Sequence, residues 1–289
     1  MKKILLLIVL YSSASYCQEN KHPLESIIDI SIRLADRDST FYKFENGKLI
    51  SRQEIGRKPT FYFYNQNGLL EKESITYDGG ETQEVFYTYN SDGYITEIVK
   101  SGKKDASQEL IPWHKNVISY TFINNNNFVV TSVSDYTPKP TGENLRVYEI
   151  KDGVLKTSSK QGKFYSENQF KIEKGNIVTH ERTKPSKENY VTAFKFDDKE
   201  NVFKMLFKNM FGSKYFMNQM LAQNNIYDHY DDYISENNCL SLRNVKTTKN
   251  VSISEKTSTI KYNKENLPVE IKLDSDPGFG NLFIIKYKN

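Results

Sequence analysis

The feature that most constrains this chain is a short recurring pattern. Two aromatic or aliphatic residues are separated by one residue of any kind and are followed by turn-forming residues. In the clearest copies, at residues 62–69 and 87–95, Asn65 and Gly68 follow Tyr64, and Asn90 and Gly93 follow Tyr89. Apolar residues at a period of two are typical of half-buried strands, and Asn and Gly supply the positive φ that tight hairpins need. The pattern predicts antiparallel hairpins.

The pattern recurs along most of the chain. Its second apolar position falls at residues 44, 64, 89, 122, 150, 172, 196 and 262, and Gly153 and Gly175 stand in two of the weaker turns. A repeat of about two strands and two turns predicts an all-β protein built as a long antiparallel meander. Because one face of the sheet is aromatic, the meander must be curved or curled on itself, or covered.

One stretch departs from the strand pattern. In residues 203–222 the apolar residues Phe203, Leu206, Phe207 and Met210 recur at helical spacing, and Phe216, Met217, Met220 and Leu221 follow in the same way. Gly212 and Ser213 divide this stretch into two short helices. A methionine-rich binding surface is one interpretation. We favour a helical insertion at 203–222 that covers the aromatic face of the sheet.

The N-terminus resembles a secretory signal. Lys2 and Lys3 precede an apolar run at 4–10 and small residues at 12–15, which predicts cleavage between Cys17 and Gln18. The rival is a lipoprotein signal with Cys17 as the lipidated residue, but Tyr16 is bulky where that signal needs a small residue. We therefore expect a signal peptide at 1–17, a lead-in at 18–39 and one hairpin-repeat domain at 40–289.

The turns resemble the YD-repeat hairpins of the RHS class, with Asn65 and Asn90 in place of the usual Asp. They are also similar to degenerate hairpins in exported proteins of Bacteroidetes-type bacteria. Those proteins carry an Asp-x-Lys-x-Asn-Pro-Phe turn before a helical stretch and a later Asn-Asn pair. Residues 197–203 match that turn except for Val202 in place of Pro, and residues 224–225 or 237–238 are candidates for the pair. The resemblance implies a fold more than a function.

No signature of catalysis or cofactor binding stands in the sequence. The polar group at 227–233 offers carboxylates and an imidazole for a metal, but a solvated connection is the simpler interpretation. Residues 274–280 suggest a calcium loop, yet the further acids and the terminal Glu are missing, so we expect a hairpin turn. After cleavage the lone thiol is Cys239, which we interpret as a small buried residue. We predict no catalytic residue, metal or cofactor.

The composition narrows the class of function. Forty basic and 36 acidic residues give a formal charge of +4, too little and too dispersed to predict nucleic-acid binding. A transmembrane barrel is disfavoured because Lys, Glu and Asn interrupt the strand pattern. We predict an exported, non-enzymatic envelope protein in the periplasm, at the outer membrane or outside the cell. It would serve as a scaffold or binding surface for a glycan or another envelope protein. The alternative is an envelope hydrolase with a carboxylate site near the helical insertion.

Overall fold

The computed structural model describes residues 23–32, 37–124, 127–136, 144–161, 164–183, 189–222, 235–247, 251–274 and 280–288. Its strands are β1 (Leu24–Ile32), β2 (Arg37–Glu45), β3 (Lys48–Glu54), β4 (Thr60–Tyr64), β5 (Leu70–Thr76), β6 (Thr82–Tyr89), β7 (Ile95–Lys103), β8 (Ile111–Asn124), β9 (Asn127–Tyr136), β10 (Asn144–Lys151), β11 (Val154–Gln161), β12 (Phe164–Glu173), β13 (Asn176–Thr183), β14 (Asn189–Glu200), β15 (Asn237–Thr247), β16 (Val251–Tyr262), β17 (Pro268–Asp274) and β18 (Gly280–Tyr287). The helices are α2 (Val202–Phe211), the 3-10 turn η1 (Gly212–Lys214) and α3 (Tyr215–Ala222).

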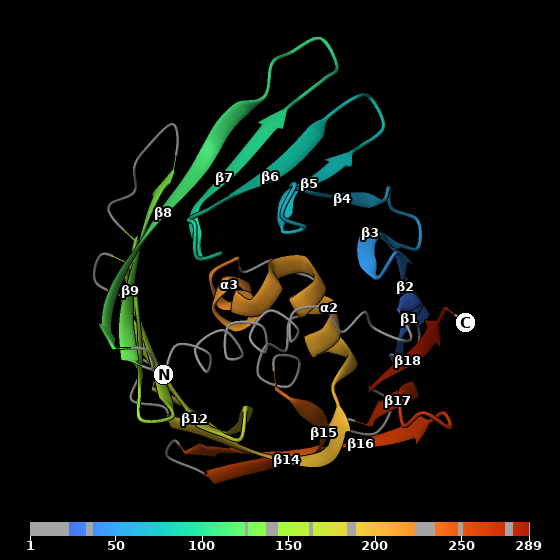
Figure 1. Ribbon diagram of the computed structural model, residues 1–289, viewed down its shortest axis with the longest axis vertical. Helices are drawn as coiled ribbons and strands as arrows, with labels where there is room; N and C mark the ends of the chain where they lie inside the picture. Colours follow the sequence, from blue (N-terminus) through green and yellow to red (C-terminus); the bar gives the residue numbers. More distant parts are fainter. Residues whose placement is uncertain are drawn as a thin grey trace, which may run out of the picture.

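The strands form one closed antiparallel barrel. Each strand pairs with its sequence neighbours, and β1 pairs with both β2 and β18, so the 18-stranded sheet has no free edge. Figure 1 shows the ring of strands, with β1 beside β18, around the helices. The predicted all-β antiparallel sheet is confirmed, but the expectation of a meander that is only curved or curled is wrong, because the sheet closes into a barrel. Closure pairs the backbone groups that an open edge would leave exposed.

The segment 18–39, expected as a lead-in, contributes β1 and the first residues of β2 to this barrel. Among the described residues no helix is both long and apolar enough to cross a membrane.

The helices occupy the inside of the barrel. A ring of about 16–18 strands is too wide for its own side chains to fill, and here the helices occupy part of the interior. Helix α2 buries Phe203, Leu206, Phe207, Met210 and Phe211, and its Phe211 meets Tyr87 of β6 edge-on with ring centroids 6.1 Å apart. The predicted insertion at 203–222, divided at Gly212, is confirmed as a packing element.

The β4–β5 and β6–β7 turns, at the end of the barrel where the helices lie, repeat one geometry. The side chain of Asn65 accepts the backbone N–H groups of Asn67 and Leu69 at 3.0 and 3.1 Å. Asn90 does the same in the next repeat, at 3.1 and 3.0 Å. Gly68 and Gly93 close these turns with φ of +72° and +84°, and the two-residue turns ending in Gly153 and Gly175 have φ of +75° and +80°.

Gly93→Ala tests the role of positive φ. Nothing blocks a side chain there, because the nearest atom to an added Cβ is 3.8 Å away, so the cost is conformational. We expect the free energy of unfolding to fall by about 1–2 kcal/mol, measured by urea denaturation. Gly102→Ala is the control, since it has ordinary φ and contacts of 3.5 Å or more. Equal effects of the two changes would contradict the conformational explanation.

Candidate functional site

A pocket of about 340 Å³ lies against the inner wall of the barrel, beside the last residue of α3. It is lined from β3 by Arg52 and Glu54, from β4 by Thr60 and Tyr62, from β5 by Glu73 and Ile75, from β6 by Gln83, Val85 and Tyr87, from β7 by Lys100, and from α3 by Ala222. Its volume is at the lower end of the roughly 300–1,000 Å³ found for small-ligand pockets.

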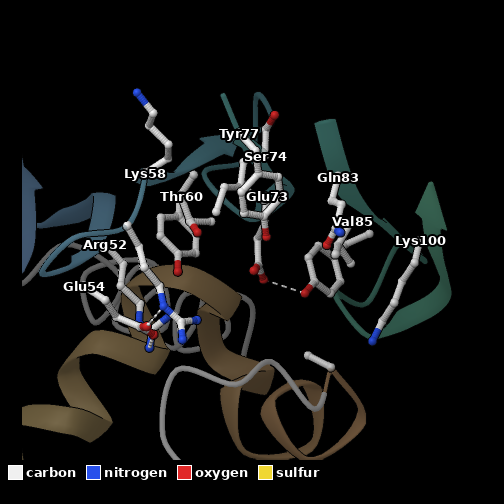
Figure 2. A pocket seen from close by; sticks show the side chains of 15 residues that line it. Arg52, Glu54, Lys58, Thr60, Glu73, Ser74, Tyr77, Gln83, Val85 and Lys100 are labelled. Atoms are coloured by element: carbon white, nitrogen blue, oxygen red, sulfur yellow. Dashed lines mark hydrogen bonds and ion pairs between the residues drawn. The ribbon is translucent and has the colours of Figure 1, made fainter. Parts of the chain in front are cut away.

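Inward orientation in this region follows from the helix contact. Tyr87 faces the helices, and residues at a spacing of two share its face. Figure 2 shows Glu73 near the centre of the pocket, with the Arg52–Glu54 pair on one side and Lys100 on the other. Five adjacent strands therefore line the pocket, and three of them, β3, β5 and β7, bring charged side chains to it.

Glu73 is surrounded by buried tyrosines. The Tyr87 hydroxyl donates a hydrogen bond to Glu73 Oε1 at 2.6 Å. Burial, followed by the charge of Glu73, raises the pKa of Tyr62 and Tyr87 well above the usual value. The same two causes raise the pKa of Tyr64 and Tyr89. These phenols therefore stay neutral at physiological pH, and that of Tyr87 is a hydrogen-bond donor to the carboxylate.

The second carboxylate of the pocket is held by arginines. Glu54 Oε1 accepts from Arg52 Nη2 at 2.7 Å, and Glu54 Oε2 lies 3.0 Å from Arg57 Nε. On the opposite side, burial lowers the pKa of Lys100; the charge of Glu73 acts against this and that of Arg146 adds to it. The pocket thus offers charged donors, a carboxylate acceptor and aromatic rings, a set suited to binding a polar ligand.

A separate polar cluster ties the start of α2 to β15. Asp197 Oδ1 accepts the backbone N–H of Lys199 at 2.9 Å and that of Asn238 at 3.1 Å. The Asn238 amide donates to Asp197 Oδ2 at 3.1 Å, and Asn201 caps α2 by accepting from Phe203 N–H at 2.9 Å. The turn at 197–203 and the pair Asn237–Asn238, both singled out in the sequence, therefore meet. The role of this cluster is to fix the start of α2 against β15.

The turn and site residues singled out in the sequence lie away from the pocket or outside the described residues. The turn residues Asn65, Gly68, Asn90 and Gly93 lie in turns at the helical end and do not line it. Cys17, Gln18 and the polar group 227–233 lie outside the described residues, as do residues 275–279. Cys239 is partly buried, packed against the core. Within the described part of the chain, no group of three or more His, Cys, Asp or Glu could hold a metal.

Sequence reasoning missed the pocket residues. Arg52, Glu73 and Lys100 stand in separate strands, and only closure with the correct register brings them together. The available signal was the phase of each strand: Glu73 shares a face with Ile75, and Lys100 shares one with Ile98.

Two of the solved structures that are similar to this chain are porin-like proteins from Bacteroides species. A porin-like protein from Bacteroides uniformis is 12% identical with a TM-score of 0.44, over 92% of this chain and 98% of that one. A porin-like protein from Bacteroides vulgatus is 9% identical with a TM-score of 0.46, over 93% and 99%. These values support no inference about function. No family model matches the chain, and no curated protein matches it.

Proposed function

We propose that this protein is an exported, non-enzymatic barrel that binds a small glycan unit in the pocket around Glu73. The observation that carries the proposal is the convergence of Arg52, Glu73, Gln83 and Lys100 with the rings of Tyr62 and Tyr87. Such a lining offers hydrogen bonds to hydroxyl groups and flat apolar area for a sugar ring. A pocket of about 340 Å³ suits a small ligand better than a protein partner.

An aqueous setting for the outer wall supports this proposal. Ion pairs join neighbouring strands on the outward face: Lys72–Glu84 at 3.1 Å, Lys115–Glu97 at 2.5 Å and Lys261–Glu270 at 2.8 Å. A lipid-facing wall needs a continuous apolar band around the barrel. These charges interrupt such a band, so we infer that the protein works in water, in the periplasm or outside the cell.

Titration calorimetry with cellobiose, maltose and xylobiose tests the proposal, using wild type, Glu73→Gln and Glu97→Gln. We expect one of the disaccharides to bind, and Glu73→Gln to weaken its binding at least tenfold, since a hydrogen bond to a charged group contributes about 1.5–3 kcal/mol. Glu97→Gln removes a carboxylate on the outward face and should bind like wild type. Absence of binding by all three sugars, or equal losses in both variants, would contradict the proposal.

The second candidate is the envelope hydrolase, because the pocket holds two carboxylates, Glu54 and Glu73, beside α3. Glycoside hydrolysis needs one of them as proton donor. Glu54 is engaged by two guanidinium groups, which disfavours that role. Release of reducing sugar from the same disaccharides, abolished by both Glu54→Gln and Glu73→Gln, would favour the hydrolase over the binding protein.

A further inference from the structure

The two faces of the barrel wall from β7 to β18 differ in charge, because basic residues lie on both faces whereas the acids lie on the outward one. Starting from inward-facing Lys100, the strand registers place Arg146 on β10, Arg182 on β13, Lys246 on β15 and Lys256 on β16 on the same inward face. Five basic residues on five strands therefore face the inside of the barrel.

The acidic residues of the same wall take the opposite face. In the regularly paired parts of β7 to β18, every acid whose side chain the structure describes is in register with outward residues; these acids are Glu97, Glu149, Glu167, Glu173, Glu181, Glu255, Glu270 and Asp274. Asp197 stands in the irregular end of β14 and is bound by Asn238. The inward acids of the barrel are on β1–β5: Asp29, Asp38, Glu54 and Glu73.

Four of the five inward basic residues are not neutralised by acids of the described wall. Within the part of the chain that the structure describes, Lys100, Arg146, Arg182 and Lys256 form no ion pair. Arg182 is exposed and the other three are half-buried. The charge of Arg146 also lowers the pKa of Lys100, after the larger effect of burial, so these two cations lie close enough to repel each other. Unpaired cations in a concave wall attract anions.

The neutral residues of this inward face include His114, Tyr190 and Leu242, which are in register with basic residues, and a larger set of small hydrogen-bonding groups. In register with the basic residues, or two positions away, are Asn116, Ser132, Ser134, Thr157, Ser159, Ser166, Asn168, Thr192, Asn244, Ser252 and Ser254. Several pair with each other across strands, as Ser159 and Ser166 do at 2.7 Å. Hydroxyl and amide groups between cations match a ligand that alternates hydroxyl and acidic groups.

We propose that this inward face, from Lys100 to Lys256, binds an acidic oligosaccharide through its carboxylate or sulfate groups. The inference rests on the proposed function: the pocket around Glu73 takes a neutral part of the glycan, and the basic wall takes the acidic units that extend from it. Lys100 lines the pocket and belongs to the basic wall, and so joins the two. Arg146 and Arg182 contribute planar guanidinium groups that match carboxylate or sulfate oxygens.

The test compares tetragalacturonate with its carboxyl-reduced, neutral counterpart by titration calorimetry at two salt concentrations. The variant is the triple change Arg146→Gln, Arg182→Gln and Lys256→Gln. The matched control replaces three outward lysines, Lys156, Lys171 and Lys195, by glutamine. We expect tetragalacturonate to bind at least tenfold more tightly than the neutral oligomer, with a tenfold or greater loss in the inward variant and less than twofold in the outward one. High salt should weaken this binding.

The outcomes separate the two proposals. Equal binding of the acidic and neutral oligomers, with loss in Glu73→Gln, would overturn the acidic ligand and leave the glycan pocket standing. Absence of binding by either oligomer would overturn the acidic ligand, and the disaccharide titrations decide the pocket separately. Equal losses in the inward and outward variants would show non-specific attraction and overturn the basic wall as a site. Tighter binding of hexathymidylate than of tetragalacturonate would overturn the sugar class. Melting curves of both triple variants monitor folding.

Discussion

Replacing Phe211 by alanine is expected to lower the free energy of unfolding by about 3–5 kcal/mol, because a large buried ring is lost and the rigid barrel cannot close around the gap. Phe211 is fully buried at the end of α2, and its ring packs edge-on against Tyr87 of the wall. It lies where the helical insertion meets the strands that form the pocket. The change therefore measures how strongly the helices stabilise the barrel.

Phe61→Ala is the matched control for this prediction. Phe61 lies on the outward face of β4 with 48% of its surface exposed, and its removal should change stability by less than about 0.5–1 kcal/mol. Chemical denaturation followed by the fluorescence of Trp113 gives both values. Similar losses in the two variants would mean that α2 does not form the core of the barrel.

The local elements of this fold were predictable because each depends on residues close in sequence. The period-two aromatic pattern and the Asn and Gly turns predict the hairpins, and the spacing of Phe203, Leu206, Phe207 and Met210 predicts α2. Their physical basis lies within a few residues of each other.

Closure was not predictable in the same way. It requires β1 to pair with β18, with Ile27 opposite Ile285 and Asp29 opposite Phe283, and nothing near Ile27 in sequence specifies that partner. An open sheet with a covered aromatic face satisfies the same local pattern. The number of strands and the volume that the helices fill decide between the two, and both are properties of the whole chain.

The difference in charge between the two faces of the wall was predictable only in part. In β14, Phe194 and Phe196 fix the inward phase, so the outward place of Lys195 could be read from the sequence. The inward place of Arg182 could not, because β13 has no long aromatic run and its phase comes from pairing with Asn168 and Tyr190. Glu73 presents the same difficulty. Between Glu73 and the end of β5, Ile75 is the one strongly apolar residue on the same face.

Asn238→Asp is expected to lower the free energy of unfolding by about 3 kcal/mol or more near neutral pH. Asn238 is 3% exposed, and its amide nitrogen lies 3.1 Å from Asp197 Oδ2. The same nitrogen donates to the carbonyl of Glu200 at 3.2 Å. The substitution replaces this donor by a carboxylate oxygen, so a buried hydrogen bond becomes a repulsion between two like charges and the Glu200 carbonyl loses a donor.

The pH dependence identifies the cause. Two carboxylates at this distance cannot both ionise without cost, so the folded protein raises the pKa of one of them above its unfolded value. A raised pKa means that the folded state binds more protons than the unfolded state, so stability falls as the pH rises through this range. The defect of Asn238→Asp relative to wild type should therefore shrink as the pH is lowered from about 7.5 to about 5.

Asn67→Asp in the exposed β4–β5 turn is the matched control, and its stability should stay within about 0.5 kcal/mol of wild type at both pH values. Denaturant titrations of the three proteins at each pH provide the comparison. A defect in Asn238→Asp that does not depend on pH would contradict the assignment of Asp197 as its partner. It would point instead to the loss of the hydrogen bonds that the Asn238 side chain donates to backbone carbonyls just before α2. These bonds tie β15 to the segment through which the chain leaves the barrel wall and enters the helices.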